Sequence, residues 1–170
     1  MQIRPATPAD VTAITAIYAH HVLHGTGTFE EVPPPPEDMA ARLAKVVAAG
    51  APWLIAEDDG GALGFAYAAQ FRDRSAYRFT AEDSVYIRHD AIGRGVGTAL
   101  LDALIEASRA FGYRELLAVI GDSENHGSIA LHRRFGFVDA GIIRNVGYKF
   151  DRWLDVVFLQ LTLSDSPTPR

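Results

Sequence analysis

The sequence contains no cysteine and no long apolar run, and both absences limit what the protein can be. Without cysteine it has no disulfide, no thiolate metal ligand and no cysteine nucleophile. This composition fits a reducing compartment. The first residues, Met1–Pro5, include no apolar stretch typical of a signal peptide, and no run approaches the length that spans a membrane. We therefore expect a cytoplasmic protein that is not inserted into a membrane.

The sequence also has fewer basic residues than acidic ones. The chain has 16 Lys and Arg against 21 Asp and Glu, which gives a net charge of −5. With no basic block, we expect no nucleic-acid partner. A hydrophobic fraction of 48% and a charged fraction of 22% are typical of a soluble globular protein, and 170 residues are enough to bury a core. We expect a single domain over residues 1–163, followed by a disordered tail, 164–170.

Apolar spacing and turn residues divide the chain into strands and helices. Apolar residues recur at helical spacing after Thr7 and Pro8, which can cap and open a helix, and again between Pro36 and Gly50. Asp58–Gly61, between two apolar stretches, is typical of a hairpin turn. The expected strands are residues 3–6, 53–57, 62–71, 82–87, 115–120, 141–148 and 154–163, and the further helices are 95–111 and 128–135. Antiparallel strands followed by one strand–helix–strand unit predict a mixed α/β sheet.

A glycine-rich turn between a strand and a helix is the most informative local pattern. Ser84–Ile87 leads into Gly93-Arg94-Gly95-Val96-Gly97, and Thr98–Leu101 continues as the helix. Such a turn exposes backbone N–H groups at the positive end of a helix dipole, which is a binding site for phosphate. A P-loop would need a lysine after its last glycine, and a dinucleotide fold would place its third glycine one position later. Both of these alternatives are excluded by the spacing.

The turn resembles the pyrophosphate-binding loop of the Gcn5-related N-acetyltransferases (Q/R-x-x-G-x-G/A), with Gly95, Val96 and Gly97 at its G-x-G end. Ile92 stands where that family has Gln or Arg. We therefore expect the backbone N–H groups from Arg94 to Gly97 to hold the pyrophosphate. The resemblance implies acetyl-CoA as co-substrate, no metal, and the Gcn5-related N-acetyltransferase fold. That fold is α/β, with a central mixed, mostly antiparallel sheet flanked by helices on both faces.

Further motifs are similar to those of the phosphinothricin and methionine sulfoximine acetyltransferases, in that family's order. They are Pro52–Glu57, Phe71-Arg72-x-Arg74-x-Ala76-Tyr77, Glu82-x-Ser84-Val85-Tyr86-Ile87, Asn125-x-x-Ser128-Ile129-x-Leu131-His132 and Val146-Gly147-Tyr148-Lys149-Phe150-x-x-Trp153-x-Asp155. Together they span nearly the whole chain. The resemblance implies an acetyl-CoA-dependent N-acetyltransferase that acts on the α-amino group of methionine sulfoximine, methionine sulfone, phosphinothricin or a related amino acid. It also implies a homodimer.

Glu82 and His132 are the candidates for proton transfer, since acetylation requires the amine to lose a proton and the departing thiolate to be protonated or stabilised. A partly buried carboxylate at Glu82 could have a raised pKa and act as base. A solvated glutamate at the start of a strand is the alternative, and the family resemblance favours the base. The imidazole of His132 can give or take a proton near pH 7, whereas the alternative is a histidine on the face of an amphipathic helix. Which of the two is the base stays open.

Other residues are expected to bind the coenzyme or the substrate. The resemblance implies that a backbone N–H of the central strand stabilises the oxyanion, which requires the strands to separate there. The coenzyme-binding candidates are Val85, Tyr86, Ile87, Gly93, Arg94, Gly95, Val96, Gly97, Thr98, Asn125 and Ser128. Asn125 and Ser128 are equally typical of a helix cap. The substrate-binding candidates are Arg72, Arg74, Tyr77, Phe29 and Glu30. Guanidinium groups suit a carboxylate or phosphinate.

Alternative functions remain open at this point. An acetyltransferase for protein N-termini, lysines or polyamines is compatible with the negative net charge, but Arg72 and Arg74 would repel a cationic substrate. A non-catalytic acyl-CoA sensor would need the glycine turn and neither Glu82 nor His132. The pair His20 and His24 shares a helix face, as metal ligands can. Because no third ligand is evident, a solvated helix end is the better interpretation.

Overall fold

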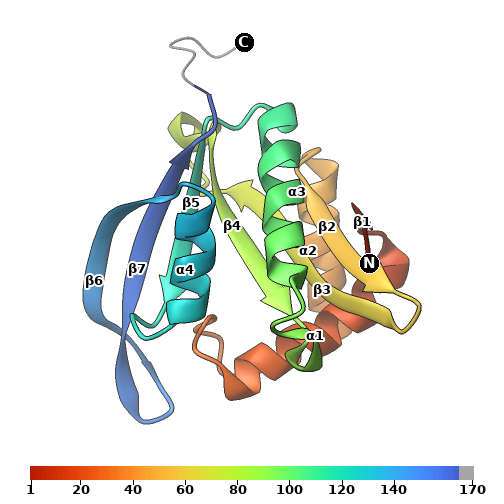
Figure 1. Cartoon of the computed structure of the whole chain (residues 1–170), viewed down its shortest axis with the longest axis horizontal. Coiled ribbons are helices and arrows are strands. Elements are labelled where there is room, and N and C mark those ends of the chain that lie inside the picture. The colour runs from red at the N-terminus through yellow and green to blue at the C-terminus, as the bar shows by residue number, and fades with distance from the viewer. Residues whose placement is uncertain (165–170) are drawn as a thin grey trace.

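The computed structural model describes residues 1–164, and its centre is a single mixed sheet (Figure 1). Seven strands of the described chain follow the spatial order β1-β2-β3-β4-β5-β7-β6. They are β1 (Gln2–Pro5), β2 (Trp53–Asp58), β3 (Gly61–Gln70), β4 (Thr80–Ile87), β5 (Glu115–Gly121), β6 (Val138–Lys149) and β7 (Arg152–Thr162). All neighbours are antiparallel except β4 and β5, which are parallel. The predicted mixed, mostly antiparallel sheet is confirmed.

Helices cover both faces of this sheet. The four α-helices of residues 1–164 are α1 (Val11–His24), α2 (Pro36–Ala48), α3 (Val96–Phe111) and α4 (His126–Arg134). In Figure 1, α3 and α4 lie in front of the sheet and α2 lies behind it. Three short 3₁₀ turns precede α1, β4 and α3: η1 (Pro8–Asp10), η2 (Ser75–Tyr77) and η3 (His89–Ala91). In the part of the chain described, no helix is long and apolar enough to cross a membrane.

Two element boundaries differ from the predicted ones in ways that affect the site. Glu82 was expected at the start of its strand, but β4 already begins at Thr80. Because Thr80 and Ala81 pair with β5, Glu82 lies inside the sheet. Helix α4 begins at His126 instead of Ser128, since Asn125 caps it. The predicted tail lies outside the described residues, apart from its first residue, 164.

Strands β4 and β5 separate part-way along their length. They pair in register only from Thr80 opposite Glu115 to Asp83 opposite Ala118. Beyond that point β4 continues to Ile87, still paired with β3, while β5 continues to Gly121, still paired with β7. The separation that the resemblance required is therefore present, and it leaves one edge of each strand open.

Alternation along β4 assigns its side chains to the two faces of the sheet. The ring of Tyr86 lies edge-on to Tyr18 of α1, at 4.9 Å between centroids, so even-numbered residues of β4 face α1. Asp83 bonds His132 of α4, so odd-numbered residues face α3 and α4. Glu82 and Asp83, adjacent in sequence, therefore lie on opposite faces, and the opening between β4 and β5 connects them.

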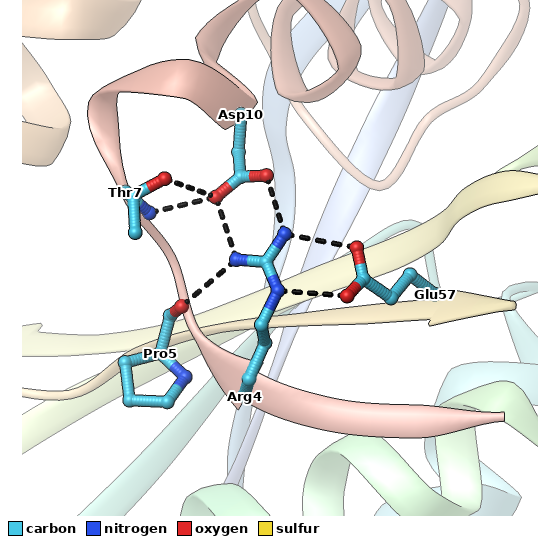
Figure 2. Close-up of polar contacts among 5 residues, drawn as sticks. All are labelled: Arg4, Pro5, Thr7, Asp10 and Glu57. Atoms are coloured by element: carbon cyan, nitrogen blue, oxygen red, sulfur yellow. Dashed lines mark hydrogen bonds and ion pairs between the residues drawn. The ribbon is translucent and has the colours of Figure 1, made fainter.

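A charge cluster holds the first strand to the sheet (Figure 2). The guanidinium of Arg4 in β1 donates to both carboxylate oxygens of Asp10, at 2.7 and 2.8 Å, and to both of Glu57 in β2, at 2.8 Å. Asp10 also accepts from the backbone N–H and hydroxyl of Thr7. The hydrogen bonds from Arg4 lower the pKa of Asp10 to about 2. This cluster fixes the start of α1, the helix that covers one side of the site.

Candidate active site

The opening between β4 and β5 is the neck of a cavity of about 1040 Å³. Its walls come from β4, β5, α4, the turn before α3 and the segment after α1. Thirteen of the predicted site residues line it: Phe29, Glu82, Val85, Tyr86, Ile87, Gly93, Gly95, Val96, Gly97, Thr98, Asn125, Ser128 and His132. Five predicted site residues do not: Glu30, Arg72, Arg74, Tyr77 and Arg94. Most of the predicted site residues therefore meet at one cavity.

The glycine turn forms a donor-rich end of this cavity. Gly93 and Gly95 both have left-handed backbone, with φ of 81° and 80°, and Gly95 is the N-cap of α3. A Cβ at either glycine would meet no atom within 4 Å, so each faces open space. The first N–H groups of α3, at Val96, Gly97 and Thr98, have no partner within the helix by its geometry. This end of the cavity therefore suits a phosphate.

Arg94 differs from its predicted role. Its guanidinium turns away from the cavity and pairs with Asp58 of the β2–β3 hairpin, at 3.0 Å. Its backbone N–H donates to the carbonyl of Ala91, at 3.3 Å. Neither its side chain nor its N–H group is therefore directed at the anion end. Ile92, which is 66% exposed, lines the cavity in the place of a polar side chain.

The backbone of β4 presents a donor at the neck of the cavity. The bonds Phe71 N–H to Thr80 O and Arg88 N–H to Leu63 O show that even-numbered residues of β4 bond to β3. The N–H groups of odd-numbered residues point the other way, and at Val85 and Ile87 β5 has already separated. The carbonyl of Ile87 accepts from Nε2 of His21, at 2.8 Å. The N–H of Val85 therefore faces the opening.

Glu82 has the electrostatics of a general base. Burial, together with the neighbouring charge of Asp83, raises its pKa to about 7, although the guanidinium of Arg72 acts in the opposite direction. A carboxyl with such a pKa is partly ionised at neutral pH. The alternative of a solvated glutamate does not fit this environment, because Glu82 lines the cavity from inside β4.

His132 is a buried, fully bonded imidazole and does not lie on an exposed helix face. It is 3% exposed, with Nδ1 2.7 Å from the carbonyl of Ser128 and Nε2 2.9 Å from the carboxylate of Asp83. Burial lowers its pKa, but the hydrogen bond and charge of Asp83 and the bond to Ser128 outweigh burial, so the pKa is raised. Because both nitrogens face acceptors, this environment favours the imidazolium form of His132, on the face opposite Glu82.

Replacing Asp83 tests this buried pair. We expect Asp83→Asn to lower the melting temperature and the pKa of His132, since burial then acts without its counter-charge. Because the pKa of His132 is higher in the folded protein than in the unfolded chain, its pairing with Asp83 stabilises the fold below the unfolded pKa of 6.5. This stabilisation is lost as pH rises through the folded pKa. The stability gap between wild type and variant should therefore narrow at alkaline pH. Thermal melts against pH, with NMR titration of His132, measure both effects; a gap independent of pH would contradict the ion pair.

Asn125 and Ser128 are both a helix cap and part of the cavity wall. The side-chain oxygen of Asn125 accepts the N–H of Ser128, at 3.2 Å, and so caps α4. Both residues also line the cavity. The cap orients α4 with its N-terminal end toward the cavity, and a contact with the coenzyme stays a prediction.

The predicted substrate residues do not gather at one place. Arg72, Arg74 and Tyr77 lie exposed in the β3–β4 loop, where the amide of Gln70 donates to the carbonyls of Arg72 and Arg74, at 2.5 and 3.2 Å. Of the three, Arg72 is near enough to influence the pKa of Glu82. Arg74 and Tyr77 lie outside the cavity wall, because the loop carries them away from β4.

Glu30 does not line the cavity, whereas Phe29 does. The carboxylate of Glu30 binds the guanidinium of Arg42, at 2.6 and 3.2 Å, and accepts the hydroxyl of Tyr18, at 3.0 Å. Its charge is therefore already paired within the protein. Phe29 projects to the wall from the same segment and is 37% exposed.

Sequence reasoning missed several residues of the site. Tyr18, Tyr67 and Asp83 all line the cavity. A signal existed for Asp83 alone, since strand alternation places it on the face opposite Glu82. The others come from elements distant in sequence.

As for metals, among the described residues no cluster of three or more His, Cys, Asp or Glu side chains could hold an ion. His20, which shares a helix face with His24 as metal ligands can, stacks its ring on that of His89, at 4.5 Å between centroids.

Comparison with known proteins agrees with the fold and the cavity. Residues 3–158 match the family described as "Acetyltransferase (GNAT) domain". The chain is 54% identical over 166 residues to a phosphinothricin N-acetyltransferase of Alcaligenes faecalis, covering 98% of this chain and 84% of that one. It is 44% identical to an L-methionine sulfoximine/L-methionine sulfone acetyltransferase of Pseudomonas paraeruginosa, covering 95% and 94%.

A solved structure shows the same arrangement with a coenzyme. A phosphinothricin acetyltransferase from Sinorhizobium meliloti, in complex with acetyl-CoA, superposes with a TM-score of 0.96 at 42% identity, covering 99% of this chain and 92% of that one. With the separated β4 and β5 and the glycine turn at the start of α3, these findings agree on one conclusion. The chain belongs to the GNAT acetyltransferase family.

Proposed function

We propose that this enzyme transfers the acetyl group of acetyl-CoA to the α-amino group of a small amino-acid-like substrate. Methionine sulfoximine, methionine sulfone, phosphinothricin and related amino acids are the proposed acceptors. The observation that carries the proposal is Glu82, a carboxyl with a pKa of about 7 inside the cavity where β4 and β5 separate. The names of relatives at 54% and 44% identity support the choice of acceptor.

The residues present fit acetyl-CoA. The anion end of the cavity has open space beside Gly93 and Gly95 and unpaired helix N–H groups at Val96 and Gly97. The separated strands offer an extended edge for the amide groups of the pantetheine arm. When bound, acetyl-CoA supplies an activated acetyl group as a thioester.

Acetylation then requires the following groups from the chain. Glu82 accepts a proton from the ammonium of the amino acid, and the freed lone pair attacks the thioester carbonyl. The N–H of Val85 donates to the carbonyl oxygen as it becomes negative. As the new C–N bond forms, the C–S bond breaks, and the second amine proton is available to the leaving thiolate. His132 contributes a fixed positive charge on the far side of β4, since neither of its nitrogens is free to accept.

Arg72 is the proposed partner of the acceptor carboxylate. It is exposed, it lies near Glu82, and a guanidinium binds carboxylate or phosphinate oxygens in pairs. Acetylation of lysines or polyamines is disfavoured because Arg72 and Arg74 would repel a cationic chain near the cavity. We also place the reaction in the cytoplasm, because the cysteine-free composition fits a reducing compartment, and we propose no nucleic-acid partner for a chain of net charge −5.

A panel of acceptors tests the proposed function. Release of free thiol from acetyl-CoA is followed with phosphinothricin, methionine sulfoximine, methionine sulfone, ordinary amino acids, a polyamine and a lysine-containing peptide. We expect turnover with the amino-acid-like compounds only. Turnover with the polyamine or the peptide, and with no α-amino acid, would overturn the assignment.

We also propose a homodimer formed through β6, the exposed edge of the sheet. Apart from its last residue, Lys149, this strand is exposed or half-exposed along its length, and it pairs with β7 alone. Large apolar side chains of the β6–β7 hairpin are exposed: Val138, Ile142, Ile143, Val146, Tyr148, Phe150 and Trp153. A long apolar edge strand invites pairing with another chain, and a second copy would cover it.

A charge placed on β6 should separate the two copies. We expect Ile143→Asp to shift the protein from dimer to monomer, because the carboxylate would be buried without a partner at the interface. Val47→Arg, at an exposed apolar site on α2, is the matched control and should leave the dimer intact. Light scattering coupled to size-exclusion chromatography measures the mass. A wild type that elutes as a monomer would contradict the proposal.

A further inference from the structure

Lys149 is a buried lysine that the proposed chemistry does not use. It ends β6, is 2% exposed, and donates from Nζ to the backbone carbonyls of Gly25 and Thr28, each at 2.8 Å. Those acceptors lie more than 120 residues earlier in the chain, in the segment that follows α1. The contact therefore joins the C-terminal hairpin to the N-terminal wall of the cavity.

The segment Gly25–Phe29 needs such an anchor. All five residues line the cavity, and none belongs to a helix or strand, so their carbonyls have no regular partners. Two of these carbonyls bind Lys149. The hydroxyl of Thr28 also bonds that of Tyr18, at 2.8 Å, which ties the same segment to α1.

The hairpin also supports the ring at the end of this segment. A Cβ on Gly147 would lie 2.2 Å from the ring of Phe29, and one on Gly121 would lie 2.8 Å from it. The absence of side chains at Gly147 and Gly121 therefore leaves the space that the ring fills. Phe29 is held by β6 and β5 on one side and faces the cavity on the other.

The residue type at position 149 fits this task. Only two of the 16 basic residues in the sequence are lysines, and the other, Lys45, is exposed on α2. A compact ammonium directs three donors in different directions and fits between two carbonyls, whereas the flat guanidinium of arginine is larger and suits paired oxygens. The buried ammonium thus serves as a small cross-link between two backbone segments.

We propose that Lys149 is a positioning residue that fixes the Gly25–Phe29 wall, which Thr28 ties to α1 on the side of β4 that carries Glu82, and so sets the fit of the amino-acid substrate without touching it. The inference rests on the proposed function for the identity of the acceptor. The anion end of the cavity is built from the turn before α3, whereas the ammonium of Lys149 binds the carbonyls of Gly25 and Thr28 and lies over the ring of Phe150. Its loss should therefore affect the acceptor and leave acetyl-CoA binding unchanged.

The test compares Lys149→Met with Lys45→Met in the full-length enzyme. Methionine keeps most of the apolar stem and removes the ammonium together with its two hydrogen bonds. We expect kcat/KM for the best acceptor to fall about tenfold to hundredfold, as for a misplaced wall, while the Kd for acetyl-CoA is unchanged. Hydrogen exchange measured by mass spectrometry should rise in the peptide that contains residues 25–30 and not in α3. Lys45→Met should behave as wild type in all three measurements.

Other outcomes also decide the matter. Unchanged exchange in residues 25–30 of Lys149→Met, or an equal loss of acetyl-CoA affinity, would overturn the proposal. If Lys149→Met does not fold, Lys149→Arg replaces it: the charge is kept, the larger head displaces the carbonyls, and the same split between acceptor and coenzyme is expected. If the wild type acetylates no amino acid, the proposed function fails, and hydrogen exchange alone still tests the role of Lys149.

Discussion

Glu82→Gln should lower kcat by about 10² to 10⁴, because the amide cannot accept the proton of the substrate ammonium. Affinity for acetyl-CoA should be unchanged, since Glu82 lies at the acceptor side of β4 and not at the glycine turn. Steady-state kinetics and equilibrium binding of acetyl-CoA measure the two quantities. The matched control is Glu106→Gln, an exposed glutamate of α3 that should keep wild-type rates.

The pH dependence gives the same assignment a second test. Glu82 must be deprotonated to act as base, so kcat/KM of the wild type should rise with pH and level off above a pKa of about 7. This inflection should be absent from the residual activity of Glu82→Gln. An inflection retained in the variant would assign the titration to a group other than Glu82.

As pH rises, the contribution of Glu82 to the stability of the wild type should fall while the activity rises. The folded pKa of Glu82 is raised from 4.5 to about 7, so the folded state binds its proton more tightly than the unfolded state. Its contribution to stability is present below about pH 4.5 and is lost as pH rises through about 7. Glutamine does not titrate. The melting temperature of Glu82→Gln, relative to the wild type, should therefore rise between about pH 5 and about pH 8.

Local signals were enough to predict the scaffold of the site. The glycine turn before α3 is specified by neighbouring residues: Gly93 and Gly95 take left-handed backbone that other residues rarely adopt. Asn125 and Ser128 form the helix cap that their spacing indicated. The strands of the mixed sheet were predicted from short apolar stretches and from the hairpin turn at Asp58–Gly61. Each of these features depends on residues close together in the chain.

Partners distant in sequence could not be predicted in this way. The ion pair of His132 with Asp83 joins residues 49 apart, and the one between Arg94 and Asp58 joins residues 36 apart. Each depends on how a helix or loop is rotated against the sheet, which periodicity does not specify. The same holds for Lys149, whose sequence neighbours give no hint of a contact with Gly25 and Thr28.

The resemblance to a family identified candidate residues, but it did not give their positions in the structure. It named Glu82 and His132 together as proton-transfer candidates, but Glu82 projects from one face of β4, whereas His132 in α4 binds Asp83 on the other face. It also grouped Arg72 with Arg74 and Tyr77, of which Arg72 alone influences Glu82. Which face of the sheet each candidate residue occupies depends on the register of β4 and on the packing of α4, neither of which a motif specifies.

Gly95→Val should raise the KM for acetyl-CoA by about one to two orders of magnitude, which corresponds to about 1.4 to 2.8 kcal/mol of lost binding. Gly95 has φ of 80°, and β-branched residues are strongly disfavoured there, so the turn must rearrange and its N–H groups leave their common direction. A side chain at this position would also enter the open space beside the turn, where no protein atom lies within 4 Å. The kcat at saturating acetyl-CoA should change little, because Glu82 and Val85 are untouched.

Gly112→Val separates this effect from strain in general. Gly112 ends the same helix with φ of 104° and has the same open surroundings, but it lies at the far end of α3 from the cavity. Both variants should therefore lose a similar amount of thermal stability, whereas Gly95→Val alone should lose affinity for acetyl-CoA. Because Ile92 offers no polar side chain, we expect the backbone donors beside Gly95 to make most of the contact with the pyrophosphate. An unchanged KM for acetyl-CoA in Gly95→Val would show that the coenzyme is held elsewhere.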